Sequence, residues 1–187
     1  MKNFNTFVND LKEEENIESF TQEETGMKVI CPKDENGNWT KVSDLEGFSV
    51  FLAGPCPRNN YESDWRNEAF DIFRDLGFEG TVISPTNDKY DENNKDELEM
   101  QTEWEHKMME AANLIFFNLD KDDEHPGFTT NYECGEWFSN KSKQKLVYCP
   151  RENTKRANRY IIIKAKQNSI KVVDTNLREA IKEIQWA

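Results

Sequence analysis

Short apolar runs alternate with amphipathic segments five times after residue 47, and this alternation constrains the fold more than any other feature. The apolar runs predict strands at residues 48–53, 81–84, 114–117, 145–149 and 170–173. Apolar side chains recur at helical spacing over residues 65–76, 97–112, 130–138, 154–167 and beyond 175. Because short connections join these strands and helices in turn, the sequence predicts an α/β fold: a five-stranded parallel sheet with helices on both faces.

The run Tyr160-Ile161-Ile162-Ile163 is compatible with a strand or a helix, because periodicity does not separate the two in a short apolar segment. Its β-branched residues favour a strand. The alternation along the chain calls for a helix at this place, so we predict that residues 154–167 are helical.

The first 46 residues form a different kind of segment, which is polar and acidic. Four apolar residues near its start have the spacing of one amphipathic helix: Phe4, Phe7, Val8 and Leu11. Residues 27–31 and 39–42 flank the turn signal Asn36-Gly37, which predicts a β-hairpin. We therefore expect an N-terminal appendage (residues 1–46) before a catalytic domain (residues 47–187).

The charge balance limits the class of partner. Lys and Arg number 24 and Asp and Glu 36, which gives a formal net charge of −12. So acidic a surface repels polyphosphate and argues against a nucleic acid polymer. A single nucleoside or nucleotide in a local pocket remains compatible with this charge.

Metal and membrane sites have little support in the sequence. The four cysteines form no Cys-x-x-Cys pair and the chain has two histidines, which disfavours a structural zinc site. No apolar run approaches the roughly 20 residues that cross a bilayer, and the N-terminus lacks the apolar stretch of a signal peptide. We expect a cytoplasmic protein with reduced thiols and no membrane partner.

Two glutamates are the best candidates for chemistry. Ligands of parallel α/β sheets bind outside the carboxyl ends of the strands, and Glu133 lies in the helix that follows the third predicted strand. Glu105 lies in the helix that leads into this strand. Taken alone, Glu133 is equally explained as a favourable charge near a helix N-terminus, and Glu105 as an exposed side chain. A glycosyl-transferring site, however, needs two carboxylates.

Five stretches follow one another in the chain: Val50-Phe51-Leu52-Ala53-Gly54-Pro55, Trp65-Arg66, Gln101-x-x-Trp104-Glu105, Ala111-Ala112-Asn113-Leu114-Ile115-Phe116-Phe117 and Pro126-Gly127-Phe128-Thr129-Thr130-Asn131-x-Glu133-x-Gly135. Together they resemble the nucleoside 2-deoxyribosyltransferase family and its glycosidase relatives, over about residues 48–185. The most specific part is the run that ends in Asn131-x-Glu133-x-Gly135. The resemblance implies a flavodoxin-like (Rossmann-like) five-stranded parallel sheet, in agreement with the alternation.

The resemblance also implies roles for the two glutamates. Glu133 stands where the family has its nucleophile, which attacks C1′ of the deoxyribose and forms a covalent deoxyribosyl intermediate. A second base (transfer) or water (hydrolysis) then captures this intermediate. Glu105 stands where an acidic residue contacts the base and can carry its proton.

Further substrate contacts are implied at Gly54, Arg58, Trp104, Asp120, Thr130 and Asn131. Asp120 is the best match to an acidic residue that holds sugar or base. Phe51 stands where well-known members carry a tyrosine that orients the nucleophile, so another donor, such as Asn131, has to replace its hydroxyl. Arg66 is compatible with a reach into the site or with a structural ion pair.

The resemblance implies no metal or organic cofactor, because the carboxylates supply both nucleophile and proton. It also implies a homo-oligomer that acts on a small nucleoside or nucleotide. Two alternatives stay open. One is a non-catalytic nucleotide-binding protein that senses or sequesters its ligand. The other is a hydrolase of nucleoside monophosphates or larger nucleotides, in which Arg58 pairs with phosphate, although Pro55 and Pro57 beside it donate no backbone N–H.

Overall fold

The computed structural model describes residues 26–56, 64–91, 93–121, 127–151 and 156–186. Its strands are β1 (Lys28–Ile30), β2 (Ser49–Ala53), β3 (Thr81–Ile83), β4 (Leu114–Asn118), β5 (Gln144–Tyr148) and β6 (Lys171–Val173). Its helices are α1 (Trp65–Asp75), α2 (Glu97–Ala111), α3 (Phe128–Trp137), α4 (Arg156–Gln167) and α5 (Leu177–Lys182), with a 3-10 turn η2 (Val42–Asp44).

The strands form one parallel sheet with the order β1-β3-β2-β4-β5-β6. The predicted α/β fold with a parallel sheet is confirmed, and so is the helix predicted at residues 154–167, which is α4. The sheet has six strands instead of the five predicted. The additional strand is β1, which precedes the region where the alternation begins.

β1 corrects the prediction of a hairpin for residues 27–42. It pairs in parallel with β3, Lys28 beside Thr81 and Ile30 beside Ile83. Within residues 26–56, which the structure describes, one antiparallel bridge, between Lys33 and Trp39, corresponds to the predicted hairpin. The edge of β3 offers a complete row of backbone partners to β1, whereas an isolated two-stranded hairpin is marginally stable. The predicted helix of residues 4–11 lies outside the described residues, and a domain boundary at residue 46 stays a prediction.

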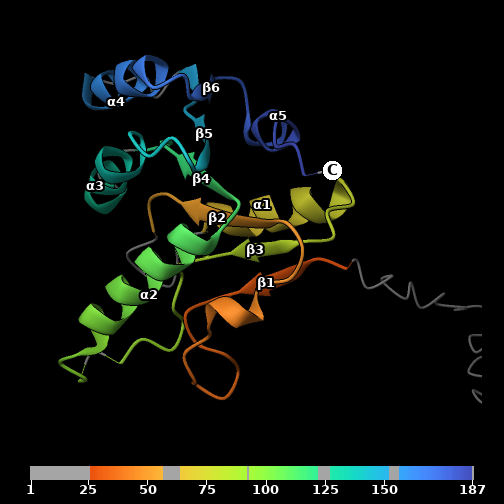
Figure 1. Cartoon of the computed structure of the whole chain (residues 1–187), viewed down its shortest axis with the longest axis vertical. Coiled ribbons are helices and arrows are strands. Elements are labelled where there is room, and N and C mark those ends of the chain that lie inside the picture. The colour runs from red at the N-terminus through yellow and green to blue at the C-terminus, as the bar shows by residue number, and fades with distance from the viewer. Residues whose placement is uncertain (1–25, 57–63, 92, 122–126, 152–155, 187) are drawn as a thin grey trace, which may run out of the picture.

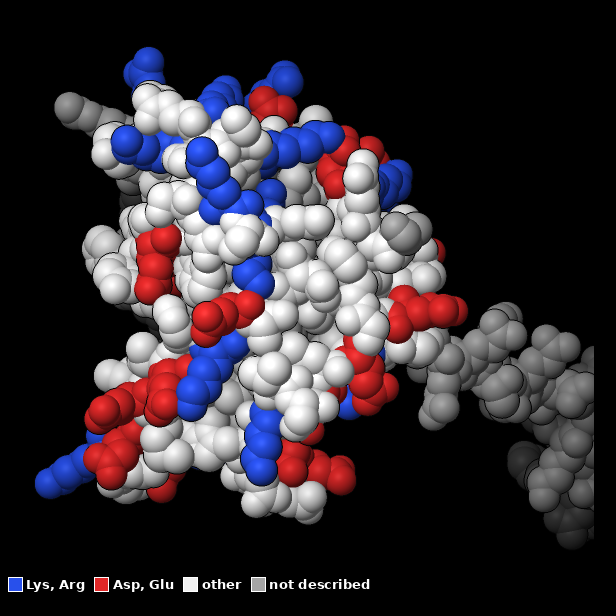
Figure 2. Space-filling model, viewed as in Figure 1, with Lys and Arg blue, Asp and Glu red and all other residues white. Residues whose placement is uncertain are grey.

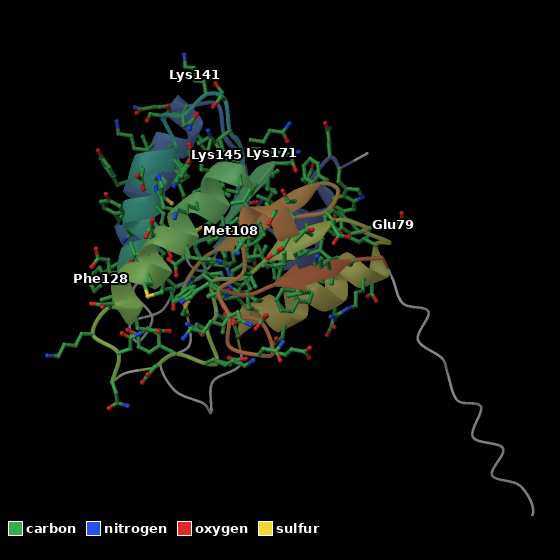
Figure 3. All side chains as sticks on the ribbon, turned by 60° about the horizontal axis from the view of Figure 1, so that its bottom comes forward. Glu79, Met108, Phe128, Lys141, Lys145 and Lys171 are labelled. Carbon is green, nitrogen blue, oxygen red and sulfur yellow. The ribbon has the colours of Figure 1, made fainter. Side chains whose placement is uncertain are left out.

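Alternate residues of each strand enter one of two hydrophobic cores. One core lies under α2, α3 and α4 and contains Phe51, Phe117 and Met108. The other lies under α1 and α5 and contains Leu52 and Phe116. Figure 1 shows α2, α3 and α4 along one side of the sheet, and Met108, labelled in Figure 3, lies between α2 and the strands. The predicted cover of both faces is thus present.

The order of the strands creates the place for a cleft. The chain runs from β2 outward to β3 and then returns to the other side of β2 as β4, so that β2 and β4 are neighbours. The connections after these two strands diverge at their carboxyl ends, where ligands of such sheets bind. Helix α3 enters from this end through Gly127, whose φ of 57° is in the left-handed region that favours glycine.

Charged side chains are unevenly spread over one face. Figure 2 shows Lys and Arg most dense over the α4 end of this face, whereas Asp and Glu, with some Lys and Arg among them, are more frequent toward the α2 end. None of the helices in the described ranges has the length and apolar character that crossing a membrane requires.

Candidate active site

A cleft of about 430 Å³ lies at the carboxyl ends of the strands, where β2 and β4 diverge. The segment after β2 forms one wall, α2 forms the second and the start of α3 the third. The described residues that line it are Gly54, Pro55, Cys56, Pro85, Leu98, Gln101, Thr102, Glu105, Gly127, Phe128, Thr129, Thr130 and Glu133. Both predicted catalytic glutamates, Glu105 and Glu133, thus face one cavity.

Glu133 lies on the inward face of α3. Thr130, Glu133 and Trp137 are buried at spacings of three and four, so the helix presents this face to the core. The side chain of Glu133 is 7% exposed. The pKa of its carboxyl is raised from 4.5 to about 7, mainly by loss of hydration and then by the nearby Glu105 carboxylate, while the Arg66 guanidinium opposes the shift. Glu133 is therefore poised to titrate near neutral pH.

Glu105 lies on α2 and faces Glu133 across the cleft. Burial raises the pKa of its carboxyl, and two groups oppose this effect: the Gln101 amide and the Arg66 guanidinium. Gln101 donates a hydrogen bond of 2.9 Å from Nε2 to Oε1 of Glu105. Two buried carboxylates that interact in one cavity titrate as a pair, so the protonation of one depends on the state of the other.

The two glutamates also line a second hollow, of about 690 Å³, between α2 and α3. This hollow is lined by further acidic side chains, among them Glu103 and Glu136, and by His106. Since Glu105 and Glu133 line both cavities, they lie at the boundary between the two. A group bound in either hollow is thus close to the carboxylates.

Arg66 is a buried cation behind the cleft, and its importance was left open by the sequence. It is 0% exposed. Its guanidinium donates to the backbone oxygens of Leu52 (3.1 Å), Gly54 (3.0 Å) and Pro55 (3.2 Å), and it forms an ion pair of 3.1 Å with Asp64. Arg66 therefore fixes the segment after β2 and also opposes the rise in the pKa values of the two candidate glutamates. The sequence signal for this role was the position of Arg66 on the face of α1 that packs against the sheet, near the end of β2.

Among the predicted substrate contacts, Gly54 and Thr130 line the cleft. A Cβ at Gly54 would lie 2.8 Å from Cζ2 of Trp65, so glycine is required at this close approach. Trp104 is instead buried in the core, and its Nε1 donates to the backbone oxygen of Thr40 at 3.0 Å. Asp120 follows β4 and is not among the lining residues of the described chain, and Arg58 lies outside the described residues.

Asn131 does not take the place of the expected tyrosine hydroxyl beside Glu133. Its Oδ1 accepts a hydrogen bond from Lys121, and the residue lines a separate groove between α3 and α4. Phe51 is fully buried in the core. Within the described residues, no side chain donates a hydrogen bond to Glu133. Its carboxyl is thus held by packing and by the field of its neighbours.

In the parts of the chain that the structure describes, no group of three or more His, Cys, Asp or Glu side chains is placed to hold a metal ion. Cys134, next to the candidate nucleophile, is buried in the core, and loss of hydration raises the pKa of its thiol. A protonated buried thiol is a poor nucleophile. The thiol of Cys56, which does line the cleft, also has a raised pKa because of loss of hydration. The carboxylates are therefore the better candidates for reactive groups in this cleft.

Comparison with known proteins gives one family. A family model described as nucleoside 2-deoxyribosyltransferase like matches residues 47–153, which is more than half of the chain. A solved structure described as a conserved protein from Enterococcus faecalis V583 is similar, with 18% sequence identity and a TM-score of 0.45 over 74% of this chain and 99% of that chain. No curated protein matches the sequence.

Proposed function

The chain belongs to the nucleoside 2-deoxyribosyltransferase-like family, and from this premise we propose that it breaks or exchanges the N-glycosidic bond of 2′-deoxynucleosides in the cleft of Glu133 and Glu105. The family supports glycosyl transfer in general. The particular reaction, its substrate and the roles of the two glutamates are our proposal.

The reaction consists of two displacements at one carbon. An oxygen of ionised Glu133 attacks C1′, the bond from C1′ to the base nitrogen breaks, and its electron pair leaves with the base. Protonated Glu105 gives its proton to the departing base. In the second step, the ionised Glu105 takes a proton from an incoming base or from water, which attacks C1′ and releases Glu133. Two inversions retain the configuration at C1′.

The observation that carries this proposal is the pair of buried carboxylates in one cleft. The chemistry needs one carboxylate ionised and the other protonated at the same pH. The pKa of Glu133 is raised to about 7, and that of Glu105 is raised by burial. Because each ionised group disfavours ionisation of the other, the pair holds one proton over a range of pH, and the attacking form is the one in which this proton has moved from Glu133 to Glu105. Titratable groups with shifted pKa values in a cleft are typical of catalytic sites.

The cleft has the polarity that a neutral nucleoside requires. Its described lining contains apolar side chains, such as Leu98 and Phe128, together with the polar groups of Gln101 and Thr130. Phe128 is 74% exposed and lies at the outer edge of the molecule (Figure 3). Aromatic and apolar walls with a few polar groups suit a planar base and a sugar.

A second candidate, from a different class, is a nucleotide-binding protein without turnover. One observation favours it: among the described residues, no side chain donates a hydrogen bond that would hold the carboxyl of Glu133 in an attacking geometry. The cleft would then bind a nucleotide and leave it intact.

One experiment separates these functions. The protein is incubated with deoxyinosine and free adenine, and the products are separated by chromatography. New deoxyadenosine identifies a transferase, and hypoxanthine with deoxyribose identifies a hydrolase. Binding without any product, for nucleosides and nucleoside monophosphates alike, would contradict the proposal and support the binding protein. In the same assay Glu133→Gln should form no product, and Glu68→Gln, at an exposed position on α1, is its matched control for the loss of one carboxylate.

A further inference from the structure

A chain of polar contacts connects the N-terminal segment to the catalytic cleft. Lys33 Nζ lies 2.5 Å from Oε1 of Glu97, the first residue of α2. Asn87, in the loop after β3, donates from Nδ2 to Oε1 of Glu97 (3.3 Å) and to Oε1 of Gln101 (3.0 Å). Gln101 in turn donates to Glu105 at 2.9 Å. The contacts thus run from residue 33 to a candidate catalytic carboxyl without a gap.

The polarity of this chain is fixed at its outer end. The Lys33 ammonium lowers the pKa of Glu97, so Glu97 is ionised at neutral pH and only accepts hydrogen bonds. The amide of Asn87 must therefore present its NH₂ group to Glu97. The NH₂ group of Asn87 also donates to Oε1 of Gln101. The NH₂ group of Gln101 therefore points to Glu105. A rotated Gln101 amide would place its oxygen against a carboxylate oxygen of Glu105, and its NH₂ against that of Asn87.

Other contacts hold the same parts together. Gln101 Nε2 also donates to the backbone oxygen of Pro85 at 3.2 Å, and Lys33 Nζ donates to that of Lys89 at 3.1 Å. Further along α2, the indole of Trp104 donates to Thr40 at 3.0 Å. Residues 33–40 therefore contact α2 at its first residue and again one position before Glu105.

These contacts connect residues outside the family match with residues inside it. Lys33 precedes residue 47, where the match begins, and it is 11% exposed in its side chain, while Glu97 is 1% exposed. A buried ion pair contributes less to stability than its Coulomb attraction suggests, because both ions lose their hydration. The ion pair also orients the polar groups next to it, which is an effect separate from stability. Here these groups connect the pair to the cleft.

We propose that Lys33, Glu97, Asn87 and Gln101 form a positioning relay, in which the N-terminal segment, together with the Pro85 carbonyl, fixes the direction of the Gln101 amide and so the placement and proton affinity of Glu105. The proposal rests on the proposed function for the catalytic meaning of Glu105. The relay itself is a property of the protein without substrate. It gives the segment before residue 47 a part in the site.

Several charged or titratable groups face Glu105 and set its proton affinity together with the relay. Arg66 on α1 and Gln101 on α2 favour the ionised form, whereas Glu133 on α3 and the thiol of Cys56 after β2 interact with it as acidic neighbours. The relay is therefore tested by variants that leave these other groups in place.

The test follows the titration of Glu105 by ¹³C NMR in protein labelled at the glutamate side-chain carboxyl, with the signal assigned from Glu105→Gln. Gln101→Met removes the donor, and we expect the midpoint of Glu105 to rise by about 0.5–1 pH unit. We expect Lys33→Met to raise it in the same direction by about 0.3–0.5 unit, and Lys33→Arg to restore it.

Two further variants separate the relay from simple charge effects. Lys107→Met removes a lysine that pairs with Glu103 on the exposed face of the same helix, and we expect no shift of the Glu105 midpoint. The double variant Lys33→Met/Glu97→Met removes both charges of the buried pair. Its direct Coulomb effect on Glu105 is small, so a raised midpoint in this variant comes from the loss of the relay.

The NMR midpoints test the relay whether or not the protein turns over nucleosides. An unchanged midpoint in Gln101→Met, or equal midpoints in Lys33→Met and Lys107→Met, would overturn it. Loss of the fold in both Lys33 variants would give Lys33 a structural role only and would also overturn its part in the relay. If the proposed function holds as well, Lys33→Met lowers kcat about tenfold with little change in KM. A shifted midpoint without any turnover would reject the proposed function and leave the relay standing.

Discussion

Two buried glutamates of this protein have opposite surroundings. Glu97, at the start of α2, is 1% exposed and lies 2.5 Å from the Lys33 ammonium, which lowers the pKa of its carboxyl. Glu133, on α3, is 7% exposed, and no Lys or Arg of the described residues forms an ion pair with it. The pKa of Glu133 is raised to about 7.

The comparison shows that a buried carboxylate can be stabilised by polar partners, as at Glu97, or left without them, as at the candidate site. Burial of an unpaired charge is costly, and most folds pair it or bind a proton. At Glu97 the protein supplies a cation, an asparagine and a second asparagine, Asn94, whose Nδ2 donates to Oε2 at 3.2 Å. Among the described residues, Glu133 has none of these partners, and its carboxyl binds a proton up to about pH 7. Such a loss of stability is common where activity requires a reactive group.

The largest effect that separates the two glutamates is on turnover. We expect Glu133→Gln to lower the rate of base release from deoxynucleosides by at least about 10³-fold, since an amide cannot replace the nucleophile. Glu97→Gln should retain the rate within about tenfold, because Glu97 acts only through other residues. The measurement is chromatography of the products under identical conditions. Equal losses in the two variants would remove the distinction on which the proposed mechanism depends.

The second effect is on thermal stability and concerns the partner of Glu97. Lys33→Met leaves a buried carboxylate without a cation, and we expect Tm at pH 7 to fall by about 10 °C. Because the folded pKa of Glu97 is lowered, the contribution of the pair is present above the ordinary value of 4.5 and disappears as the pH falls through the folded pKa. The difference from the unmodified protein should therefore shrink in acid.

Lys107→Met is the matched control for this variant, because Lys107 pairs with Glu103 on the same helix but both side chains are more than half exposed. Exposed pairs contribute little, so its Tm should stay within the error of calorimetry. A similar fall of Tm in both variants would mean that burial does not distinguish the two pairs.

The third and smallest effect concerns the stability of Glu133→Gln. Its sign is opposite to that of Lys33→Met, because this substitution stabilises the protein. The folded pKa of Glu133, about 7, lies above the ordinary 4.5, so the folded protein keeps a proton that the unfolded chain releases between these values. The free energy of unfolding therefore falls as the pH rises through this range. We expect Glu133→Gln to be more stable than the unmodified protein by roughly 2–3 kcal/mol at pH 8.

The gain in Glu133→Gln should vanish below about pH 4, where Glu133 is protonated in both states. Urea unfolding at pH 4 and pH 8 measures it. A variant that is less stable at pH 8 would show that the ionised carboxylate has a stabilising partner after all.

The sequence was sufficient for the architecture because hydrophobic periodicity is a local signal. Each short apolar run became a strand, and the ambiguous Tyr160–Ile163 run was resolved by its place in the alternation. A strand at residues 27–31 was predicted, and β1 (Lys28–Ile30) lies there, but its predicted partner was wrong: it pairs with β3. The Asn36-Gly37 turn signal next to it favoured a hairpin, whereas the unpaired edge of β3 is a distant feature that the local sequence does not contain.

The location of the candidate site was predictable, because it follows from the chain topology. The contacts of individual residues were not, because they depend on the direction of each side chain. Glu105 and Glu133 follow from the motif and the strand ends, and the structure places both in one cleft. Trp104, one residue before Glu105, points to the core instead, because neighbouring positions on a helix face different directions. The buried Arg66 and the relay that begins at Lys33 depend on contacts between segments distant in the chain, which periodicity does not report.

The central claim is that Glu133 is the nucleophile, and mass spectrometry of the acid-quenched protein tests it most directly. The protein is mixed with a deoxynucleoside, quenched during turnover and digested with a protease. The account predicts a peptide containing Glu133 that has gained one deoxyribosyl group, and no such peptide from Glu133→Gln. Turnover that proceeds without this adduct at every quench time, or an adduct on another residue, would contradict the account.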